Sequence, residues 1–140
     1  MTDRTQELMA AIYTTLSGDS TLTALIGSGR VFNGVPAGQV CPYVEIGEAT
    51  ANNYHTSSGD AQEHTLTIHC WTEQEVSGKS AKLQLLEIVK RVRDLLHYQT
   101  IALSAGNMPS LWCEFTEPAT RDPDGVSWHG VLRFRAVTEN

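Results

Sequence analysis

The first helix is predicted by the spacing of apolar residues near the N-terminus. Apolar and small side chains recur at intervals of three and four, at Leu8, Ala11, Ile12, Thr15 and Leu16. This spacing places them on one face of a helix that ends at Gly18. Asp19 or Ser20 then caps a short second helix, which ends at Gly27.

A longer amphipathic helix is predicted over residues 79–97. Its apolar stripe consists of Leu85, Ile88, Val89, Val92, Leu95 and Leu96. Five of the ten basic residues of the chain lie on the opposite side, at Lys79, Lys82, Lys90, Arg91 and Arg93. One face of this helix should therefore cover a sheet, and the other should meet solvent or an acidic partner.

Alternating apolar and polar residues predict the strands. They cover residues 31–33, 42–48, 64–72, 111–115 and 128–137, with a turn signal at Asp122-Pro-Asp-Gly125 before the last. Short turns between strands favour antiparallel pairing. We therefore expect an α+β fold, with an antiparallel sheet of four to five strands and two amphipathic helices packed on one face.

Residues 49–62 interrupt the strand pattern. They are almost all small and polar, and Tyr54 and His55 are their only large side chains. Such a composition buries too little apolar surface to hold a fixed shape alone. We predict a long loop or hairpin that projects from the sheet between the second and third strands.

Length and composition restrict the class of protein. The chain has 140 residues, of which 41% are hydrophobic and 19% charged, so one soluble domain over residues 1–140 is expected. No apolar run approaches the length of a membrane helix, and the polar N-terminus does not resemble a signal peptide. The expected location is the cytoplasm, without a membrane partner. Three scattered cysteines are expected to be reduced.

The charge distribution argues against nucleic-acid recognition. The formal net charge is −6 at pH 7, and residues 31–78 contain no Lys or Arg but six acidic residues, including Glu45 and Glu48. A phosphate backbone would be repelled by this stretch.

The histidines, cysteines and acidic residues do not form a recognisable catalytic or metal site. His64 and His69 project from opposite faces of their strand, and His64 and Cys70 are about 20 Å apart on one face. We interpret this pair as a surface histidine and a core cysteine. Cys41 is the most accessible thiol but has no neighbouring base. The sequence contains no hydrolase, phosphate-binding or zinc-protease motif, so no catalytic residue, metal or cofactor is expected.

The last strand and two tryptophans suggest a protein interface. One face of residues 128–137 carries Arg133 and Arg135 among apolar residues, and Trp71 and Trp112 lie out of phase with the expected core. Tryptophan and arginine are enriched in interfaces. The alternative is that a helix covers the tryptophans.

Several segments together resemble one family. They are residues 19–27, 29–32, Val35-Pro36, 42–46, 64–71 and 79–83 with the helix end at Leu95-Leu96. In type and order they look like the tail-completion proteins, or tail terminators, of long-tailed siphovirus-like phages. The resemblance implies a single tail-terminator-like domain and a structural, non-enzymatic virion protein.

The resemblance also implies partners and a location. Such proteins form a hexameric ring on the head-proximal end of the tail tube, stop its growth and join the tail to the head connector, while DNA passes through the lumen without specific binding. The expected location is the neck region of the virion tail, assembled in the host cytoplasm. The alternatives are another neck protein, such as a head-side stopper or adaptor, or a small cytosolic enzyme that uses Cys41 or His55.

The candidate interface residues follow from charge, aromatic content and this resemblance. They are Glu45, Glu48, Tyr54, His55, Trp71, Lys82, Lys90, Arg91, Arg93, Trp112, Arg133 and Arg135.

Overall fold

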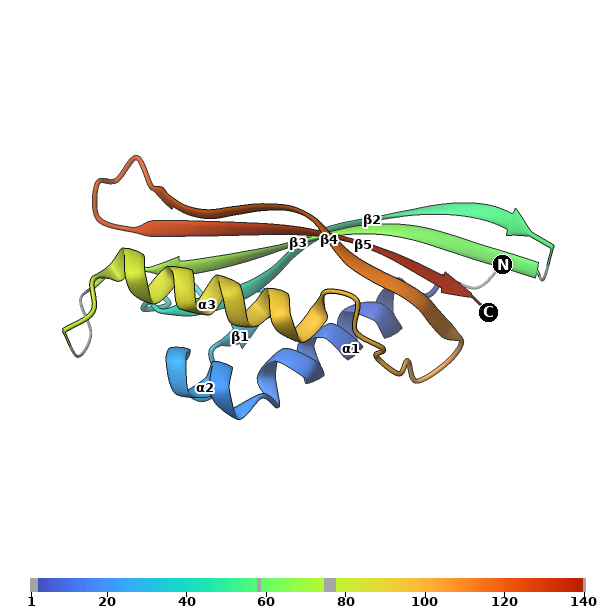
Figure 1. Cartoon of the computed structure of the whole chain (residues 1–140), viewed down its shortest axis with the longest axis horizontal. Coiled ribbons are helices and arrows are strands. Elements are labelled where there is room, and N and C mark those ends of the chain that lie inside the picture. The colour runs from blue at the N-terminus through green and yellow to red at the C-terminus, as the bar shows by residue number, and fades with distance from the viewer. Residues whose placement is uncertain (1–2, 58, 75–77, 140) are drawn as a thin grey trace.

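A computed structural model describes residues 3–57, 59–74 and 78–139. Its helices are α1 (Thr5–Ser17), α2 (Ser20–Ile26) and α3 (Ala81–Leu96), and its strands are β1 (Val31–Phe32), β2 (Tyr43–Thr56), β3 (Gly59–Thr72), β4 (Asn107–Arg121) and β5 (Trp128–Glu139). All three helices lie on the same side of one twisted sheet (Figure 1). The α+β class is confirmed.

The sheet is mixed rather than purely antiparallel. Its strand order is β1-β2-β3-β5-β4, and every neighbouring pair is antiparallel except β1 and β2. The expectation of an antiparallel sheet is therefore wrong at this edge. Residues 33–42 carry the chain back before β2 begins, so the two strands run in the same direction, which a tight hairpin turn cannot achieve.

The helices form as their sequence patterns predict. Leu8, Ile12 and Leu16 are fully buried on α1. Asp19 caps α2 by accepting a hydrogen bond from the Leu22 backbone N–H at 2.8 Å, and Ser80 caps α3 in the same way. These caps satisfy backbone donors that have no partner inside the helix.

Residues 49–56 and 59–62 form strands rather than a loop. They continue β2 and β3 as a paired hairpin, whose register runs without interruption from Ala49↔Leu66 to Thr56↔Gly59. The prediction of a loop is therefore wrong, and the alternative prediction of a hairpin is confirmed. Ladder hydrogen bonds to a neighbouring strand do not depend on apolar side chains, so a polar composition did not prevent strand formation. The hairpin extends beyond the helices in Figure 1.

Strand β4 is much longer than the predicted 111–115 and contains three register irregularities. One lies between Cys113 and Phe115, where Cys113 pairs with Phe134 and Phe115 already pairs with Arg133. The bulge moves Phe115 to the face opposite Cys113, although alternation places the two together. The expected shared face of Leu111, Cys113 and Phe115 is thus wrong for Phe115.

The expectation of a surface histidine is also wrong for His64. This side chain is fully buried on the helix-facing side of β3, as is Cys70. Polar neighbours around α1 make this possible, and Thr138 on β5 supplies a partner 2.8 Å from His64 Nε2.

Candidate functional site on the open face of the sheet

One face of the sheet is not covered by any helix of the described residues, and we call it the open face (Figure 1). Residues paired across neighbouring strands point to the same side of a sheet, so the register defines this face. Its members include Tyr43, Glu45, Glu63, Thr65, Thr67, His69, Trp71, Trp112, Phe115, Glu117, His129, Val131, Arg133, Arg135 and Val137.

Three rings stack near one end of the open face. The Trp71 and His129 rings are nearly parallel, with centroids 3.8 Å apart, and the centroid of the His69 ring lies 5.0 Å from that of His129. His69 Nδ1 and His129 Nε2 lie 2.8 Å apart and share a hydrogen bond. Burial and the neighbouring imidazole lower the pKa of His129. These contacts hold Trp71 as a rigid, half-buried part of the surface.

Two arginines occupy the middle of the open face. The Arg133 guanidinium lies over the Phe115 ring at 5.4 Å, and Phe115 is 45% exposed. Arg135 pairs with Glu63 on β3 and with Glu114 on β4 at 3.0 Å. Aromatic side chains, arginines and their paired acids on one uncovered sheet face are typical of a protein-binding surface.

The sequence-predicted candidates divide into three groups. Glu45, Trp71, Trp112, Arg133 and Arg135 meet on the open face. Glu48 joins them from a bulge in β2, since its carboxylate is 3.6 Å from His69 Nε2.

The second group, Tyr54 and His55, lies near the end of the hairpin. Tyr54 is 39% exposed, and His55 Nδ1 is 2.6 Å from an oxygen of Asp60. Together with Asn53 they line a shallow cavity of about 310 Å³.

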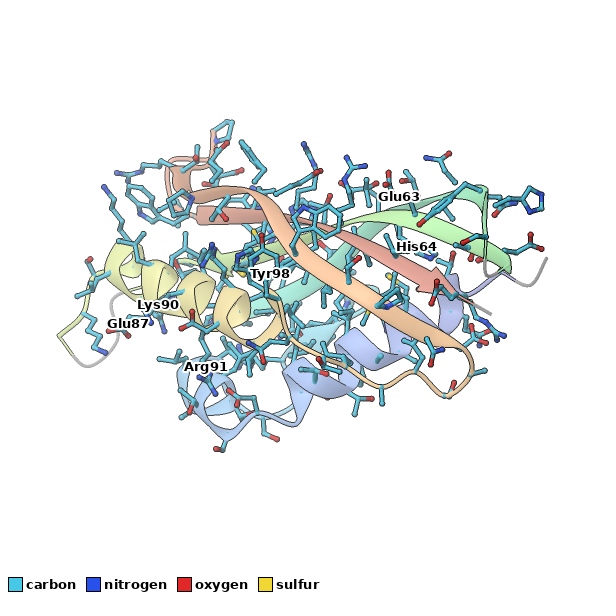
Figure 2. All side chains as sticks on the ribbon, turned by 45° about the vertical axis from the view of Figure 1, so that its right-hand side comes forward. Glu63, His64, Glu87, Lys90, Arg91 and Tyr98 are labelled. Atoms are coloured by element: carbon cyan, nitrogen blue, oxygen red, sulfur yellow. The ribbon has the colours of Figure 1, made fainter. Side chains whose placement is uncertain are left out.

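The third group lies on the helical side and is mostly engaged within the chain. Arg91 makes two hydrogen bonds to Asp19, and Lys90 pairs with Asp94 at 2.9 Å. Lys82 lies over the Trp128 ring at 5.6 Å, while Arg93 is exposed. Figure 2 shows Lys90 and Arg91 on α3 and Glu63 on the opposite side of the molecule. The structure therefore does not bring the basic helix residues to the open face.

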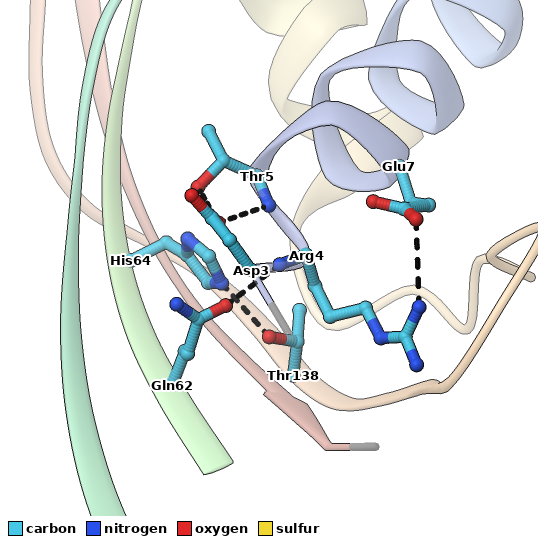
Figure 3. A network of polar contacts seen from close by, with 7 residues as sticks. All are labelled: Asp3, Arg4, Thr5, Glu7, Gln62, His64 and Thr138. Carbon is cyan, nitrogen blue, oxygen red and sulfur yellow. Dashed lines mark hydrogen bonds and ion pairs between the residues drawn. The ribbon is translucent and has the colours of Figure 1, made fainter. Parts of the chain in front are cut away.

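Sequence reasoning missed Phe115, because only the bulge in β4 turns its side chain outward. It also missed the polar network of Figure 3 at the base of the hairpin. There the Arg4 backbone N–H donates to Gln62 Oε1 at 2.8 Å, and His64 bonds to Thr138. Desolvation lowers the pKa of His64. The network joins the start of α1 to β3 and β5.

The thiols of Cys41 and Cys70 lack the environment of a nucleophile. Burial, followed by the nearby carboxylate of Glu73, raises the pKa of Cys41 to about 11. Burial also raises the pKa of Cys70. Both thiols are therefore protonated at neutral pH, whereas catalysis needs a thiolate. Within residues 3–57, 59–74 and 78–139, no three His, Cys, Asp or Glu side chains gather as metal ligands.

No helix in the described part of the chain has the length and apolarity needed to cross a membrane.

Comparisons with known proteins agree with the fold. The sequence matches the family of the tail completion protein gp17 over residues 10–139. The tail completion protein gp17 of Bacillus phage SPP1 is 25% identical over 99 residues, which are 71% of this chain and 69% of that protein.

Two solved structures share the fold. A chain in the virion of a native gene transfer agent particle has a TM-score of 0.80 and 27% identity, with 95% of both chains covered. The structure of bacteriophage SPP1 gp17 has a TM-score of 0.59 and 21% identity, with 96% of this chain and 90% of that chain covered. Because the family match spans almost the entire sequence, this chain belongs to the tail completion protein gp17 family of structural phage-tail proteins.

Proposed function

We propose that this protein assembles as a hexameric ring on the head-proximal end of a tail tube, stops growth of the tube and joins the tail to the head connector. The observation that carries the proposal is the likeness over 95% of both chains to a chain in the virion of a gene transfer agent particle. Family membership supports the same role.

In this proposal the open face docks against a neighbouring virion protein, with the tail tube protein as its partner. Phe115, Trp71 and Trp112 supply apolar contact area there, and Arg133 supplies a charge that can also stack on aromatic rings. A few central aromatic and arginine side chains commonly provide most of the binding energy of an interface.

Charge supports a ring through which DNA can pass. The open-face arginines, Arg133 and Arg135, are outnumbered by acids from its strands, namely Glu45, Glu48, Glu63, Glu114 and Glu117. Each copy also has a formal charge of −6. An acidic assembly repels phosphates and would not retain DNA as it passes.

The experiment compares particles made with and without this chain. We expect tails of uncontrolled length without attached heads when the chain is absent, and restored tails when it is supplied. Electron microscopy of the particles measures both effects. Tails of normal length in its absence would contradict the capping role. If such tails also lacked heads, a head-side stopper or adaptor would be the function instead.

A further inference from the structure

Over most of its length, the outer edge of β2 pairs with no other strand of the described residues. The short β1 pairs only with Val44 and Glu45, and β2 continues to Thr56. Residues 49–56 contain no Asp, Glu, Lys, Arg or Pro, so they lack the charges and prolines that protect strand edges from pairing. This part of β2 is also in the hairpin that extends beyond the helices (Figure 1).

The opposite edge of the sheet, β4, is protected. The Cys113 backbone N–H donates to His97 Nδ1 at 2.8 Å, and the Tyr98 N–H donates to the Leu111 carbonyl at 2.9 Å. Pro109, Pro118 and three register irregularities interrupt the rest of the strand. A regular strand cannot pair along β4 in the way it can along β2.

Residues 99–106, which follow Tyr98 outside β4, belong to no helix or strand, and the backbone bends at residues 104–106. Ile101, Leu103 and Ala105 are half-buried, and the residues between them are exposed. In the described part of the chain, the backbone of residues 100–105 makes no hydrogen bond. Backbone donors and acceptors need partners, which here are water or another chain.

The surroundings of residues 99–106 are open on two sides. A cavity of about 520 Å³ separates Thr100, Ile101 and Ala102 from α1, and another of about 240 Å³ lies between the segment and the start of β4. This segment is also free of Asp, Glu, Lys and Arg. The first cavity is also lined by Glu7, Ala10 and Ala11 of α1, and the Arg4 side chain lies beside Gly106, so an added strand would pass close to α1 and to two charged side chains.

Residues 99–106 lead directly into β4, whose first residues lie at the same end of the sheet as the β2–β3 hairpin. The register connects Tyr54 to Ala61, Ala61 to Glu139 and Glu139 to Asn107, so the hairpin and the start of β4 share one end of the strands. Copies placed side by side would bring the two different stretches together. A contact between two different surfaces is head-to-tail, and it closes into a ring when the rotation allows.

We propose that residues 49–56 of one copy pair as a strand with residues 99–106 of the next copy, so that the occupant of the open β2 edge is a second copy of this chain. The inference rests on the proposed ring and names the contact that builds it. The backbone of each stretch gives the other its missing hydrogen bonds. The open face stays uncovered and available for the tail tube.

The first test blocks each stretch with proline. Alternate residues of an antiparallel pair direct their backbone N–H outward. The Thr56↔Gly59 pair closes the turn and is hydrogen-bonded, so every second residue before it, counted from His55, directs its N–H outward. Ala51 is one of these residues. Ala51→Pro and Ala102→Pro remove N–H groups that the fold does not use, while Ala51→Val and Ala102→Val keep them as matched controls. Circular dichroism verifies that each variant is folded.

Native mass spectrometry and electron microscopy then measure ring formation, alone and on isolated tail tubes. We expect both proline variants to need at least about tenfold more protein to form rings, since each loses backbone hydrogen bonds of the contact. The valine variants should form rings like the unchanged chain.

Mixing the two proline variants provides the sharper test. Each mixed pair has one intact contact, between residues 49–56 of the Ala102→Pro copy and residues 99–106 of the Ala51→Pro copy. The reverse contact is blocked twice. We therefore expect dimers with one copy of each variant and no closed rings.

The outcomes separate this contact from the proposed function. Rings formed by folded Ala51→Pro or Ala102→Pro at unchanged concentration, or rings restored on mixing, would overturn the contact and leave the ring itself intact. An unchanged chain that forms no ring even on tail tubes would overturn the proposed ring and this inference with it.

Discussion

Gly130 shows how one missing side chain determines the distance between a helix and the sheet. A Cβ atom at this position would lie 2.6 Å from Val89 Cγ2 on α3 and 3.0 Å from the Pro118 carbonyl oxygen on β4. Both neighbours belong to packed layers, so neither can withdraw alone. The glycine therefore lets α3 lie directly against β5.

We expect Gly130→Ala to lower the free energy of unfolding by about 1–3 kcal/mol, the usual cost of adding volume to a packed interior. Gly34→Ala is the matched control, because a Cβ at Gly34 would have no atom within 4 Å. Its effect should stay within about 0.5 kcal/mol. Urea unfolding measures both, and equal losses would contradict the packing argument.

His64 makes stability depend on pH. The fold lowers its pKa below the ordinary 6.5 through burial, so the unfolded chain binds this proton before the folded chain does. Stability is therefore complete above about pH 6.5 and decreases as the pH falls below it. Asp3 and Asp19 also have lowered pKa values, but as carboxyl groups they affect stability only at more acidic pH.

We expect the unchanged chain to lose more stability between about pH 7.5 and about pH 5.5 than the His64→Gln variant, which cannot titrate there. His55→Gln serves as the control, because the His55 side chain is 90% exposed. Urea unfolding at the two pH values gives the comparison. An identical loss in the unchanged chain and in His64→Gln would refute the role of His64.

At the scale of elements, Asp19 holds α2 in two ways. It caps the helix through the Leu22 N–H, and both of its carboxylate oxygens accept hydrogen bonds from Arg91 on α3. The Arg91 guanidinium, followed by the cap bond, lowers the pKa of Asp19. A single side chain therefore begins α2 and positions it against α3.

We expect Asp19→Ala to lower the free energy of unfolding by about 1–2 kcal/mol, mainly through loss of the cap. Asp94→Ala removes the exposed pair with Lys90 and should cost less than about 0.5 kcal/mol. Thermal unfolding of both variants measures the difference. Similar losses would mean that the cap contributes no more than an exposed ion pair.

At the scale of the whole molecule, the two sides of the sheet carry different kinds of residues. The three helices cover one side (Figure 1) and bury the core, whereas the strand register places Phe115, Trp71 and Arg133 on the other. Burial of the core explains the residues on the helix-covered side, but it does not explain the aromatic and arginine side chains on the open face. Phe115 is 45% exposed and contributes little to the core, so its removal should separate docking from stability.

We expect Phe115→Ala to weaken docking to tail tubes by about tenfold or more, as truncation of a central aromatic contact does. Ring formation and the free energy of unfolding should remain nearly unchanged. Val126→Ala is the control, since Val126 is similarly exposed but lies in the turn between β4 and β5. Co-sedimentation with tail tubes measures docking, and unchanged docking of Phe115→Ala would exclude the open face at this position.

The sequence by itself determined the features that depend on neighbours along the chain. Periodicity predicted the apolar face of each helix and which residues of β3 and β5 point into the core. Local hydrogen bonding predicted the helix caps at Asp19 and Ser80. Side chains alternate between the two faces of a strand, so the outward position of Trp71 and Arg133 was also predictable from the sequence. The resemblance to tail-completion proteins rests on the same segments.

Only the tertiary structure decided what depends on a partner distant in sequence. The direction of β1, the pairing of residues 49–62 and the outward turn of Phe115 follow from strand register, which local composition does not encode. The burial of His64 required Thr138, 74 residues away along the chain. Hydrogen bonds between paired strands thus decided whether a polar segment became a strand or a loop.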